Sequence, residues 1–228
     1  ENVTALGDVM FGVMQATDSQ NDDFERLLMM VHYTHMHHAC AAEGGALMDL
    51  AVKSAITLLR YSDTIPVDKL FYTAGSVCQK QGHDNLGFVL LNRYVDLTEA
   101  IDEGDASLID NSDFVDVTHI STVDERTLPA QQYISAEDER EEVRDWVLSV
   151  CMDAKIEQSL PPADQSTGTL YAGLYDADLP ACIVTGFPVQ SWEKVDVEGF
   201  VANKQDWNAF VRKKKVDPWT GSSQVPAF

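Results

Sequence analysis

Near its end the chain reads Leu179-Pro180-Ala181-Cys182-Ile183-Val184-Thr185-Gly186-Phe187-Pro188-Val189, an apolar run that closes on a Thr-Gly pair. A second run, Val216-Asp217-Pro218-Trp219-Thr220-Gly221, ends in the same way. An apolar run followed by Gly and Pro is typical of a short strand that enters a turn. The two runs therefore predict a pair of tight loops, and the rest of the chain is interpreted around them.

Between the two runs the sequence predicts one short helix over residues 203–213. Asn203 is suited to the N-cap, and Trp207, Phe210 and Val211 follow at helical spacing. The module has a single cysteine, Cys182, and no histidine, whereas a zinc-stabilised fold needs about four ligands. We therefore expect no metal here. The fold should rest on buried apolar residues such as Leu170, Tyr171, Ile183, Val184, Trp207, Phe210 and Val211.

Two Thr-Gly loops that flank a helix resemble the U-box, the zinc-free relative of the RING finger. Cys182-Ile183-Val184-Thr185 resembles the U-box opening Cys-Pro-Ile-Thr, and residues 217–221 resemble its second loop, Asp-Pro-x-Thr-Gly. The resemblance implies a small α+β domain without zinc, with an apolar groove for ubiquitin or a ubiquitin-conjugating enzyme. By this resemblance the groove residues are Ile183, Val184, Trp207, Phe210, Pro218 and Trp219.

The sequence departs from the U-box pattern at three places. The first loop continues as Phe187-Pro188-Val189, whereas the family usually has Asp-Pro-Val. Ile183 stands where the family has proline, and no arginine follows Gly221 that could bridge to bound ubiquitin. Three interpretations stay open: a non-catalytic binding module, an active ubiquitin ligase, or loops that only close turns. The binding interpretation expects Val184, Pro218 and Trp219 to be exposed at the loop tips, because exposed apolar patches often mark partner sites.

Upstream of this module, apolar residues recur at i, i+3, i+4 and i+7 over residues 5–16, 22–42, 46–60, 68–80 and 85–101. Short breaks separate these segments, which predicts antiparallel helical hairpins in a mainly α array, an α-solenoid. One hairpin resembles a tetratricopeptide repeat. Its large and small residues lie at the repeat's offsets: Phe71, Ala74, Gly75, Cys78, Gly82, Gly87, Leu91 and Tyr94. Glu99 stands where the repeat would have its closing proline, so the repeat is degenerate.

The sequence predicts five segments: hairpins over 1–101, an acidic connector over 102–134, a helix packed on the array over 135–160, a linker over 161–169 and the U-box-like domain over 170–228. The connector has eight acidic residues among scattered apolar ones, so it is ordered only if it docks on a neighbour. Ser135 begins a capping-box pattern. Residues 161–168 are rich in turn formers, which predicts a hinge open to proteolysis.

Composition excludes several classes of function. Thirty-seven acidic and sixteen basic residues give a net charge of −21, which disfavours binding to nucleic acid and to anionic lipid. The four cysteines are scattered without a CxxC pair, which favours neither disulfides nor zinc and suits a reducing, intracellular compartment. No apolar run reaches the roughly 20 residues that span a bilayer. Because the chain begins without Met, in an apparent mid-helix, we interpret it as a fragment of a longer protein.

Two other clusters each have a functional and a structural interpretation. His32, His35 and His38 share a helical face and could bind metal, but a mixed packing face is favoured because ligands usually converge from several elements. Residues 213–215 are three consecutive lysines, either a solvated helix end or a docking point for an acidic partner. No nucleophile–base pair, phosphate loop or paired catalytic carboxylates occurs at a recognisable spacing, so we expect no catalytic residues and no cofactor.

A second resemblance covers most of the chain. The helical hairpins are followed in order by the acidic stretch 108–114, the stretches 141–148 and 183–189, and then 202–208. This order is similar to the C-terminal region of the large propeller-and-helical-repeat subunits of intraflagellar transport complex B. The resemblance implies a ciliary scaffold in the cytoplasm of the cilium or flagellum and at the ciliary base. Its partners would be other transport subunits, with ubiquitin binding at the tail. The plainer interpretation is a helical scaffold with a small αβ cap.

Overall fold

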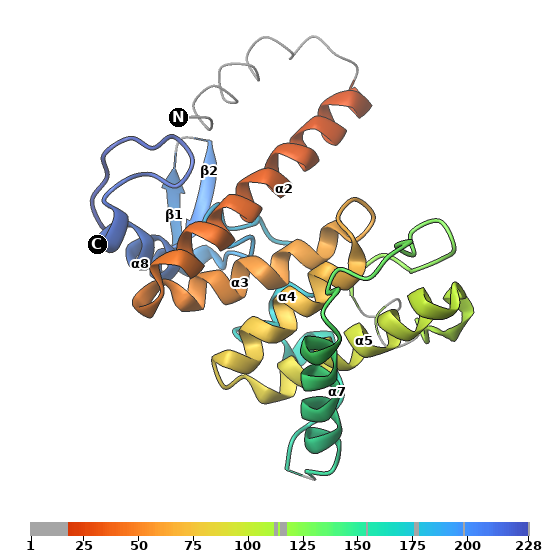
Figure 1. The fold of residues 1–228 in the computed structure, drawn as a ribbon. Helices are drawn as coiled ribbons and strands as arrows, with labels where there is room; N and C mark the ends of the chain where they lie inside the picture. The colour runs from red at the N-terminus through yellow and green to blue at the C-terminus, as the bar shows by residue number, and fades with distance from the viewer. Residues whose placement is uncertain are drawn as a thin grey trace. The chain divides into compact units, whose positions relative to one another are not determined.

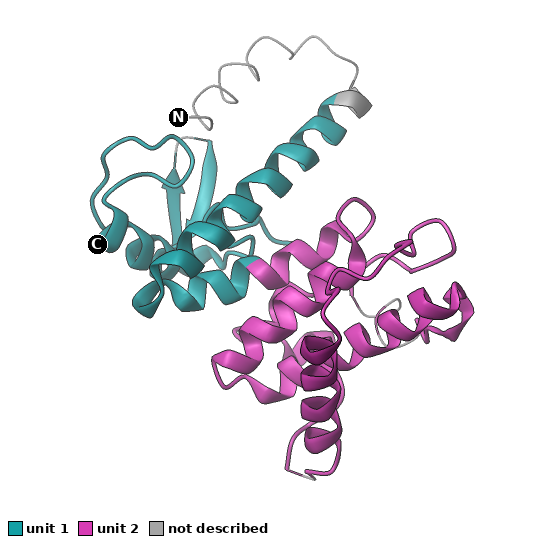
Figure 2. Cartoon of the chain, in the orientation of Figure 1, with its two compact units in different colours: residues 1–54, 178–228 teal, residues 55–177 magenta. Residues whose placement is uncertain are grey.

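The computed structural model describes residues 18–111, 114, 118–153, 155–175, 178–197 and 199–227. The helix expected over 5–16 lies outside these residues. The chain divides into two compact units, which we call unit 1 (residues 1–54 and 178–228) and unit 2 (residues 55–177), as Figure 2 shows. This division lies elsewhere than the predicted linker at 161–169, and unit 1 joins two segments that are far apart in the sequence.

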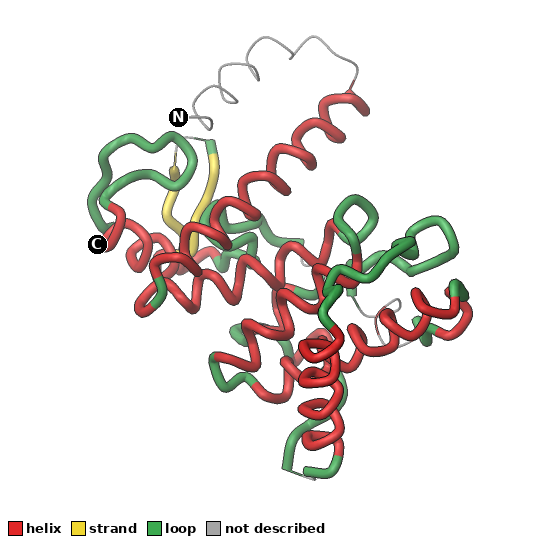
Figure 3. Tube along the Cα trace, in the orientation of Figure 1, coloured by secondary structure: helices red, strands yellow, loops and turns green. Residues whose placement is uncertain are grey.

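The described part of the chain is mainly helical, with one small antiparallel sheet of two strands (Figure 3). This confirms the predicted fold class. Helix α3 (Met48–Leu58) contributes its first residues to unit 1 and its last to unit 2.

Unit 2 is built on the hairpin of α4 (Val67–Lys80) and α5 (Asp84–Glu103), shown in Figure 1. Small residues let the two helices approach closely. A Cβ added to Gly75 would lie 2.6 Å from Leu91 Cγ, and one added to Gly87 would lie 3.1 Å from the Gln79 amide nitrogen. These glycines are small positions of the predicted repeat, although the tetratricopeptide assignment itself stays a prediction.

Part of the acidic connector packs against this hairpin. Phe114 is buried and its ring meets that of Phe71 edge-on, with ring centroids 5.3 Å apart. The Arg93 guanidinium lies over the Phe114 ring and donates hydrogen bonds to the Asp110 carbonyl and to Asn111 Oδ1, both at 2.6 Å. A buried arginine that satisfies backbone and side-chain acceptors holds this segment in place despite its acidic composition.

Helix α7 (Glu137–Cys151) also belongs to unit 2 and packs on α5. Val143, Val147 and Val150 form its buried stripe. Its N-cap residue is Ala136, so the Ser135 side chain does not cap the helix as the capping-box pattern predicted. Acidic residues still fill the first turn, where the helix dipole favours them.

The segment after α7 contains two short 3-10 helices, η4 (Ala163–Gln165) and η5 (Leu170–Gly173). Ala172 and Leu174 are buried, and the Tyr175 hydroxyl donates to the Pro161 carbonyl. Residues 170–175 therefore belong to unit 2, so Leu170 and Tyr171 do not join the core of the terminal module as the sequence predicted. The hinge at 161–168 stays a prediction.

Unit 1 begins with the long helix α2 (Asp18–Glu43), which leads through two glycines into η1 (Gly45–Leu47) and α3. Its second segment holds η6 (Ser191–Glu193), β1 (Lys194–Val197), β2 (Phe200–Asn203) and α8 (Lys204–Lys214). The strands pair in antiparallel register from Lys194 with Asn203 to Val197 with Phe200. Helix α8 matches the predicted helix to within one residue at each end.

One apolar core joins the two segments of unit 1. The first segment contributes Met36, Cys40, Leu47, Leu50 and Ala51. The second segment contributes Cys182, Ile183, Val184, Val189, Val197, Ala202, Trp207, Phe210 and Val211. Because both segments supply fully buried side chains to the same cluster, the terminal module and the α2–α3 hairpin form one folding unit.

Candidate functional site

The first loop, which we call loop 1 (residues 180–189), is closed by hydrogen bonds within its own backbone. The Cys182 amide donates to the Phe187 carbonyl at 2.8 Å, and the Gly186 amide donates to the Cys182 carbonyl at 2.7 Å. Gly186 has φ of +76°, a left-handed conformation that favours glycine. The Ile183 amide donates to the Val201 carbonyl of β2 at 2.8 Å, which ties loop 1 to the sheet. The Thr-Gly pair thus makes the turn that the sequence predicted.

The second loop, which we call loop 2 (residues 215–224), is held in its conformation by Asp217. Its Oδ1 atom accepts from the amides of Trp219 (2.7 Å) and Thr220 (2.8 Å), while its own amide donates to the Ser222 carbonyl (2.8 Å). Gly221 has φ of +71°, so the second Thr-Gly pair also needs its glycine. An aspartate that accepts from backbone amides two and three residues ahead is a common way to fix a turn.

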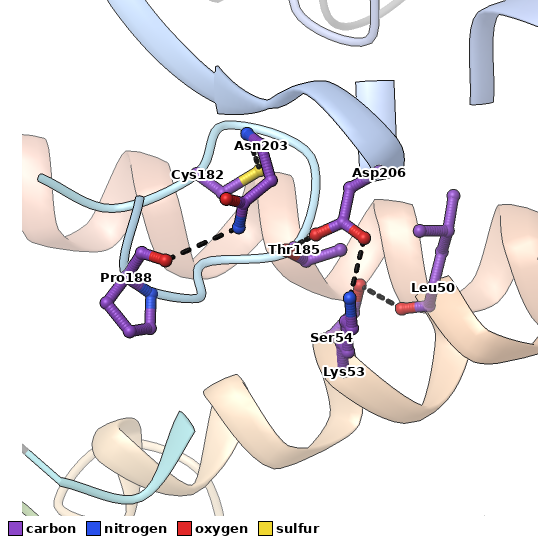
Figure 4. A network of polar contacts seen from close by, with 8 residues as sticks. All are labelled: Leu50, Lys53, Ser54, Cys182, Thr185, Pro188, Asn203 and Asp206. Carbon is purple, nitrogen blue, oxygen red and sulfur yellow. Dashed lines mark hydrogen bonds and ion pairs between the residues drawn. The ribbon is translucent and has the colours of Figure 1, made fainter. Parts of the chain in front are cut away.

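The buried carboxylate of Asp206 connects loop 1 to α8 and to α3 (Figure 4). Asp206, in the first turn of α8, accepts from the Thr185 hydroxyl at 2.9 Å and pairs with the Lys53 ammonium of α3 at 2.6 Å. Asp206 and Thr185 are 2% and 0% exposed. In the same view the Asn203 amide donates to Cys182 Sγ at 3.3 Å. Hydrogen bonds and one ion pair therefore hold loop 1 against α3 and α8.

Helix α2 lies over both loops. His32 Nε2 donates to the Ile183 carbonyl at 2.7 Å, and the Tyr33 hydroxyl donates to the Cys182 carbonyl at 3.1 Å. The His32 ring also meets the Trp219 ring of loop 2 edge-on, with centroids 5.0 Å apart. Trp219 in turn stacks at a tilt on Phe200 of β2, at 4.8 Å. One helix thus contacts the backbone of loop 1 and the aromatic side chain of loop 2.

The contact of α2 with the loops leaves two buried polar atoms unsatisfied. Among the described residues, His32 Nδ1 and Asp217 Oδ2 have no hydrogen-bond partner. Burial lowers the pKa of His32 from 6.5 to about 4, against the raising effects of the Ile183 carbonyl and the nearby Asp217 carboxylate. His32 is therefore a neutral imidazole at physiological pH, with Nε2 protonated and Nδ1 facing the interior.

The C-terminal end of α2 is held by charge. Glu43 accepts from Lys213 at 2.8 Å and from Lys214 at 2.6 Å, both in the last turn of α8. Hydrogen bonds from these two lysines lower the pKa of Glu43 to about 2. Two members of the predicted basic cluster thus have an acidic partner within unit 1.

The structure brings the predicted groove residues together, but inside the molecule. Exposed fractions are 1% for Ile183, 0% for Val184, 3% for Trp207 and 5% for Phe210, and all four belong to the unit 1 core. Pro218 is also buried, and Trp219 is half-buried against that core. The expectation that Val184 and Pro218 are exposed at loop tips is wrong, because the α2–α3 hairpin contributes to the core that encloses this module.

The histidine cluster is divided between packing and solvent. His32 and His37 are buried on α2, and His37 Nδ1 donates to the Ala51 carbonyl of α3 at 3.0 Å. His35 and His38 are exposed. Within the described residues, no group of three or more His, Cys, Asp or Glu side chains could hold a metal ion.

The cysteines divide in the same way. Burial raises the pKa of Cys40 to about 11, that of Cys78 to about 12 and that of Cys182 above its usual range, so these thiols are protonated and unreactive. Cys151 is exposed. In the part of the chain that the structure describes, no helix is both long and apolar enough to cross a membrane.

Two residues of this site, Lys53 and Asp206, did not stand out in the sequence, and His32 was noted only as a member of the histidine cluster. Asp206 offered a weak signal, an acidic residue in the first turn of an amphipathic helix. That position is usually explained by the helix dipole alone. The partners of Lys53 and His32 lie more than 150 residues away in sequence, and no local pattern encodes such a pairing.

Comparison with known proteins identifies the lineage of this chain. No family model matches it. It is 38% identical over 224 residues to the human protein named intraflagellar transport protein 172 homolog, which covers 90% of this chain. The chain is homologous to intraflagellar transport protein 172. It is also 35% identical to intraflagellar transport protein 172 of Chlamydomonas reinhardtii (91% of this chain) and 33% identical to intraflagellar transport protein osm-1 of Caenorhabditis elegans (89% of this chain). It spans only 12% of the length of each of these relatives.

Proposed function

We propose that this chain is a scaffold and interaction region of an intraflagellar transport complex B subunit and acts in ciliary assembly. Its partners are other transport subunits, and its place is the cytoplasm of the cilium or flagellum and the ciliary base. The observation that carries this proposal is homology to intraflagellar transport protein 172 over about nine-tenths of the chain, in three distantly related organisms.

The structure supports a binding role through the surface of α7. Leu148 and Met152 lie four positions apart, at and just beyond the end of this helix, and are 62% and 89% exposed. Their neighbours on the opposite face, Val143 and Val147, are buried. Apolar side chains held at helical spacing on a rigid surface are suited to contact a partner subunit.

The test uses the longer parent protein in ciliated cells that lack their own copy. The double substitution Leu148→Asp and Met152→Asp should reduce co-purification with other transport subunits and impair rescue of cilium length. Glu141→Gln and Asp145→Asn, on the same helix, are the matched control and should rescue fully. Full rescue and unchanged co-purification by the Asp variant would exclude α7 as the contact. If deletion of residues 1–228 also rescues fully, the scaffold role itself is wrong.

A second function is favoured by the geometry of unit 1, namely weak binding of ubiquitin or a ubiquitin-conjugating enzyme. What supports it is the pair of Thr-Gly loops around α8, held by hydrogen bonds to the carboxylates of Asp206 and Asp217. Among the predicted groove residues only Trp219 is partly exposed, so the contact area should be small compared with the roughly 1,200–2,000 Å² of a standard stable interface and the affinity modest. An active ligase and a purely structural cap are the alternatives.

Titration of labelled ubiquitin and of several conjugating enzymes, followed by nuclear magnetic resonance, tests this second function. Val184 is unsuitable for mutation because it is fully buried. Pro218 is unsuitable for the same reason. Trp219→Ala should weaken binding several-fold, whereas Val225→Ala, at an exposed position beyond loop 2, should not. Equal binding by all variants would place the site elsewhere. A ubiquitylation assay with the same enzymes separates a ligase, whose product formation would need the two loops, from a binding module.

A further inference from the structure

The two-loop module of unit 1 has an occupant that belongs to the same chain. Helix α2 covers loop 1 through hydrogen bonds from His32 and Tyr33 to consecutive carbonyls, those of Ile183 and Cys182. It covers loop 2 through the edge-on contact of His32 with Trp219. It also reaches the end of α8 through Glu43, which pairs with two lysines. All three elements that form a U-box groove are therefore touched by α2.

The contact of α2 with the loops includes a buried polar atom without a hydrogen-bond partner among the described residues, beside the apolar contacts of Met36 and Cys40. His32 Nδ1 and Asp217 Oδ2 are enclosed without a partner among the described residues, in side chains that are 4% and 2% exposed. A buried polar atom without a partner costs free energy that water returns when the atom is exposed. Opening this contact would hydrate His32 Nδ1, which lowers the free energy needed to separate α2 from the loops.

A hinge stands at the right place for such an opening. Gly44 and Gly45 connect α2 to η1, with φ of +65° and +51°, and a Cβ on either would have no heavy atom within 4 Å. Lys53 of α3 keeps its ion pair with Asp206 on the far side of this hinge. For α2 to swing away while α3 stays on the module, two successive glycines absorb the change in backbone angles. The hydrogen bond from His37 to the Ala51 carbonyl and the burial of Met36 and Cys40 must be released in the same movement.

We propose that α2 is an intramolecular latch that occupies the docking face of the two-loop module, so that a ubiquitin-system partner binds only after α2 swings away about Gly44–Gly45. This inference rests on the second proposed function, binding of ubiquitin or a conjugating enzyme, and adds its regulation. Because the partner binds only the open form, the apparent affinity is the intrinsic affinity multiplied by the fraction of molecules that are open. Weakening the contacts of α2 raises this fraction and therefore raises the apparent affinity.

The experiment compares the intact 228-residue chain with the double variant Tyr33→Phe and Glu43→Gln. These changes delete one hydroxyl and one charge without removing an apolar contact. Glu25→Gln, at an exposed position of the same helix, is the matched control. We expect the double variant to bind labelled ubiquitin or a responsive conjugating enzyme about fivefold or more tightly than wild type, which is within the usual range of such coupling.

Opening is followed independently by thiol labelling and hydrogen exchange. Cys40, buried on α2, should be labelled faster in the double variant, while Cys78, buried in unit 2, keeps its rate and exposed Cys151 gives the reference rate. Amides of α8 should stay protected, because a latch opens without unfolding the module. Loss of α8 protection together with faster Cys40 labelling would overturn the latch, since α2 would then be part of an indivisible core.

The two proposals fail in different ways. If wild type and the double variant bind a partner equally, or the variant binds more weakly, the latch is wrong while the binding function stands. If neither form binds any partner although Cys40 labelling shows that the variant opens, the binding function fails, and the latch over that site fails with it. If Cys40 labelling does not change and binding does not tighten, these contacts do not hold a latch.

Discussion

At the scale of single residues, His32 makes unit 1 sensitive to acid. Burial lowers its pKa from 6.5 to about 4, so the folded unit favours the neutral imidazole and the unfolded chain takes up a proton first. Stability is therefore complete above pH 6.5 and is lost as the pH falls towards 4. Since one pKa unit corresponds to about 1.4 kcal/mol, the loss from His32 amounts to about 3 kcal/mol.

The variant His32→Gln isolates this effect, because an amide does not titrate. Between pH 7 and pH 4, urea unfolding of wild type should lose about 3 kcal/mol more than unfolding of the variant. His83→Gln, in unit 2, is the control and should follow wild type. His37, whose pKa burial also lowers, adds acid sensitivity of the same sign to all three proteins. Parallel pH profiles for wild type and His32→Gln would contradict the assignment.

The buried Asp206 offers a second test at this scale. Asp206→Ala removes the carboxylate that accepts from Thr185 and pairs with Lys53, and it should lower the free energy of unfolding by about 2–3 kcal/mol. The value lies below that of a fully buried pair because the Lys53 side chain is 24% exposed. Asp196→Ala breaks a pair with Lys194 of the same 2.6 Å length, but on the surface.

That surface pair is the matched control for Asp206. It should change stability by less than about 0.5 kcal/mol, because solvent screens an exposed pair. Chemical denaturation of the two variants under identical conditions measures the difference. Equal effects of the two substitutions would mean that Asp206 does not anchor loop 1.

At the scale of elements, close approach of α4 and α5 depends on Gly75. A methyl group there would lie 2.6 Å from Leu91 Cγ and 3.1 Å from the Leu91 amide nitrogen. Gly75→Ala gains about 1 kcal/mol of helix propensity but should lose about 1–3 kcal/mol by overpacking, so a net loss of stability is expected. The same substitution in a Leu91→Ala background should lose less, which a double-mutant cycle detects. Additive effects would show that the two sites do not touch.

Helix boundaries were largely predictable from the sequence, because caps and apolar spacing are local. Residues 68–80, 85–101 and 203–213 were expected to be helical, and α4, α5 and α8 occupy nearly the same ranges. The hairpin of β1 and β2 was missed, although Val195 and Val197 alternate with polar residues before Gly199, which has φ of +89°. That alternation, followed by a glycine turn, is the signal that could have found it.

At the scale of the whole chain, the sequence could not predict that unit 1 is formed by two segments far apart in the chain. The Thr-Gly loops and their helix were recognised from local motifs. However, an apolar helical face does not say which other face it will meet. Hydrogen bonds such as that from Tyr33 to Cys182 join residues 149 positions apart, and no periodicity or turn signal encodes that distance. The buried state of Val184 follows from this pairing, which is why the loop tips were expected to be exposed.

The shared core of unit 1 makes a prediction about truncation. Residues 18–54 supply Met36, Cys40, Leu47, Leu50 and Ala51 to a core whose other members come from residues 182–211. Burial of each large apolar side chain is worth about 1.5–3 kcal/mol, so their joint loss is comparable to the whole stability of a domain, about 5–15 kcal/mol. A chain of residues 55–228 should therefore lose the tertiary structure of its terminal module.

Hydrogen exchange with mass spectrometry measures this outcome within one molecule. In the truncated chain, amides of α8 should exchange much faster than in the intact chain, because the helix has lost its packing partners. Amides of α4 and α5 belong to unit 2 and serve as the internal control. Slow exchange in α8 after truncation would show that loops 1 and 2 and α8 fold without the α2–α3 hairpin, as the sequence alone predicted for a domain over 170–228. Fast exchange in α8 together with slow exchange in α5 would show that the terminal module, unlike a free-standing U-box, needs Leu47 and Leu50 of the first segment for its core.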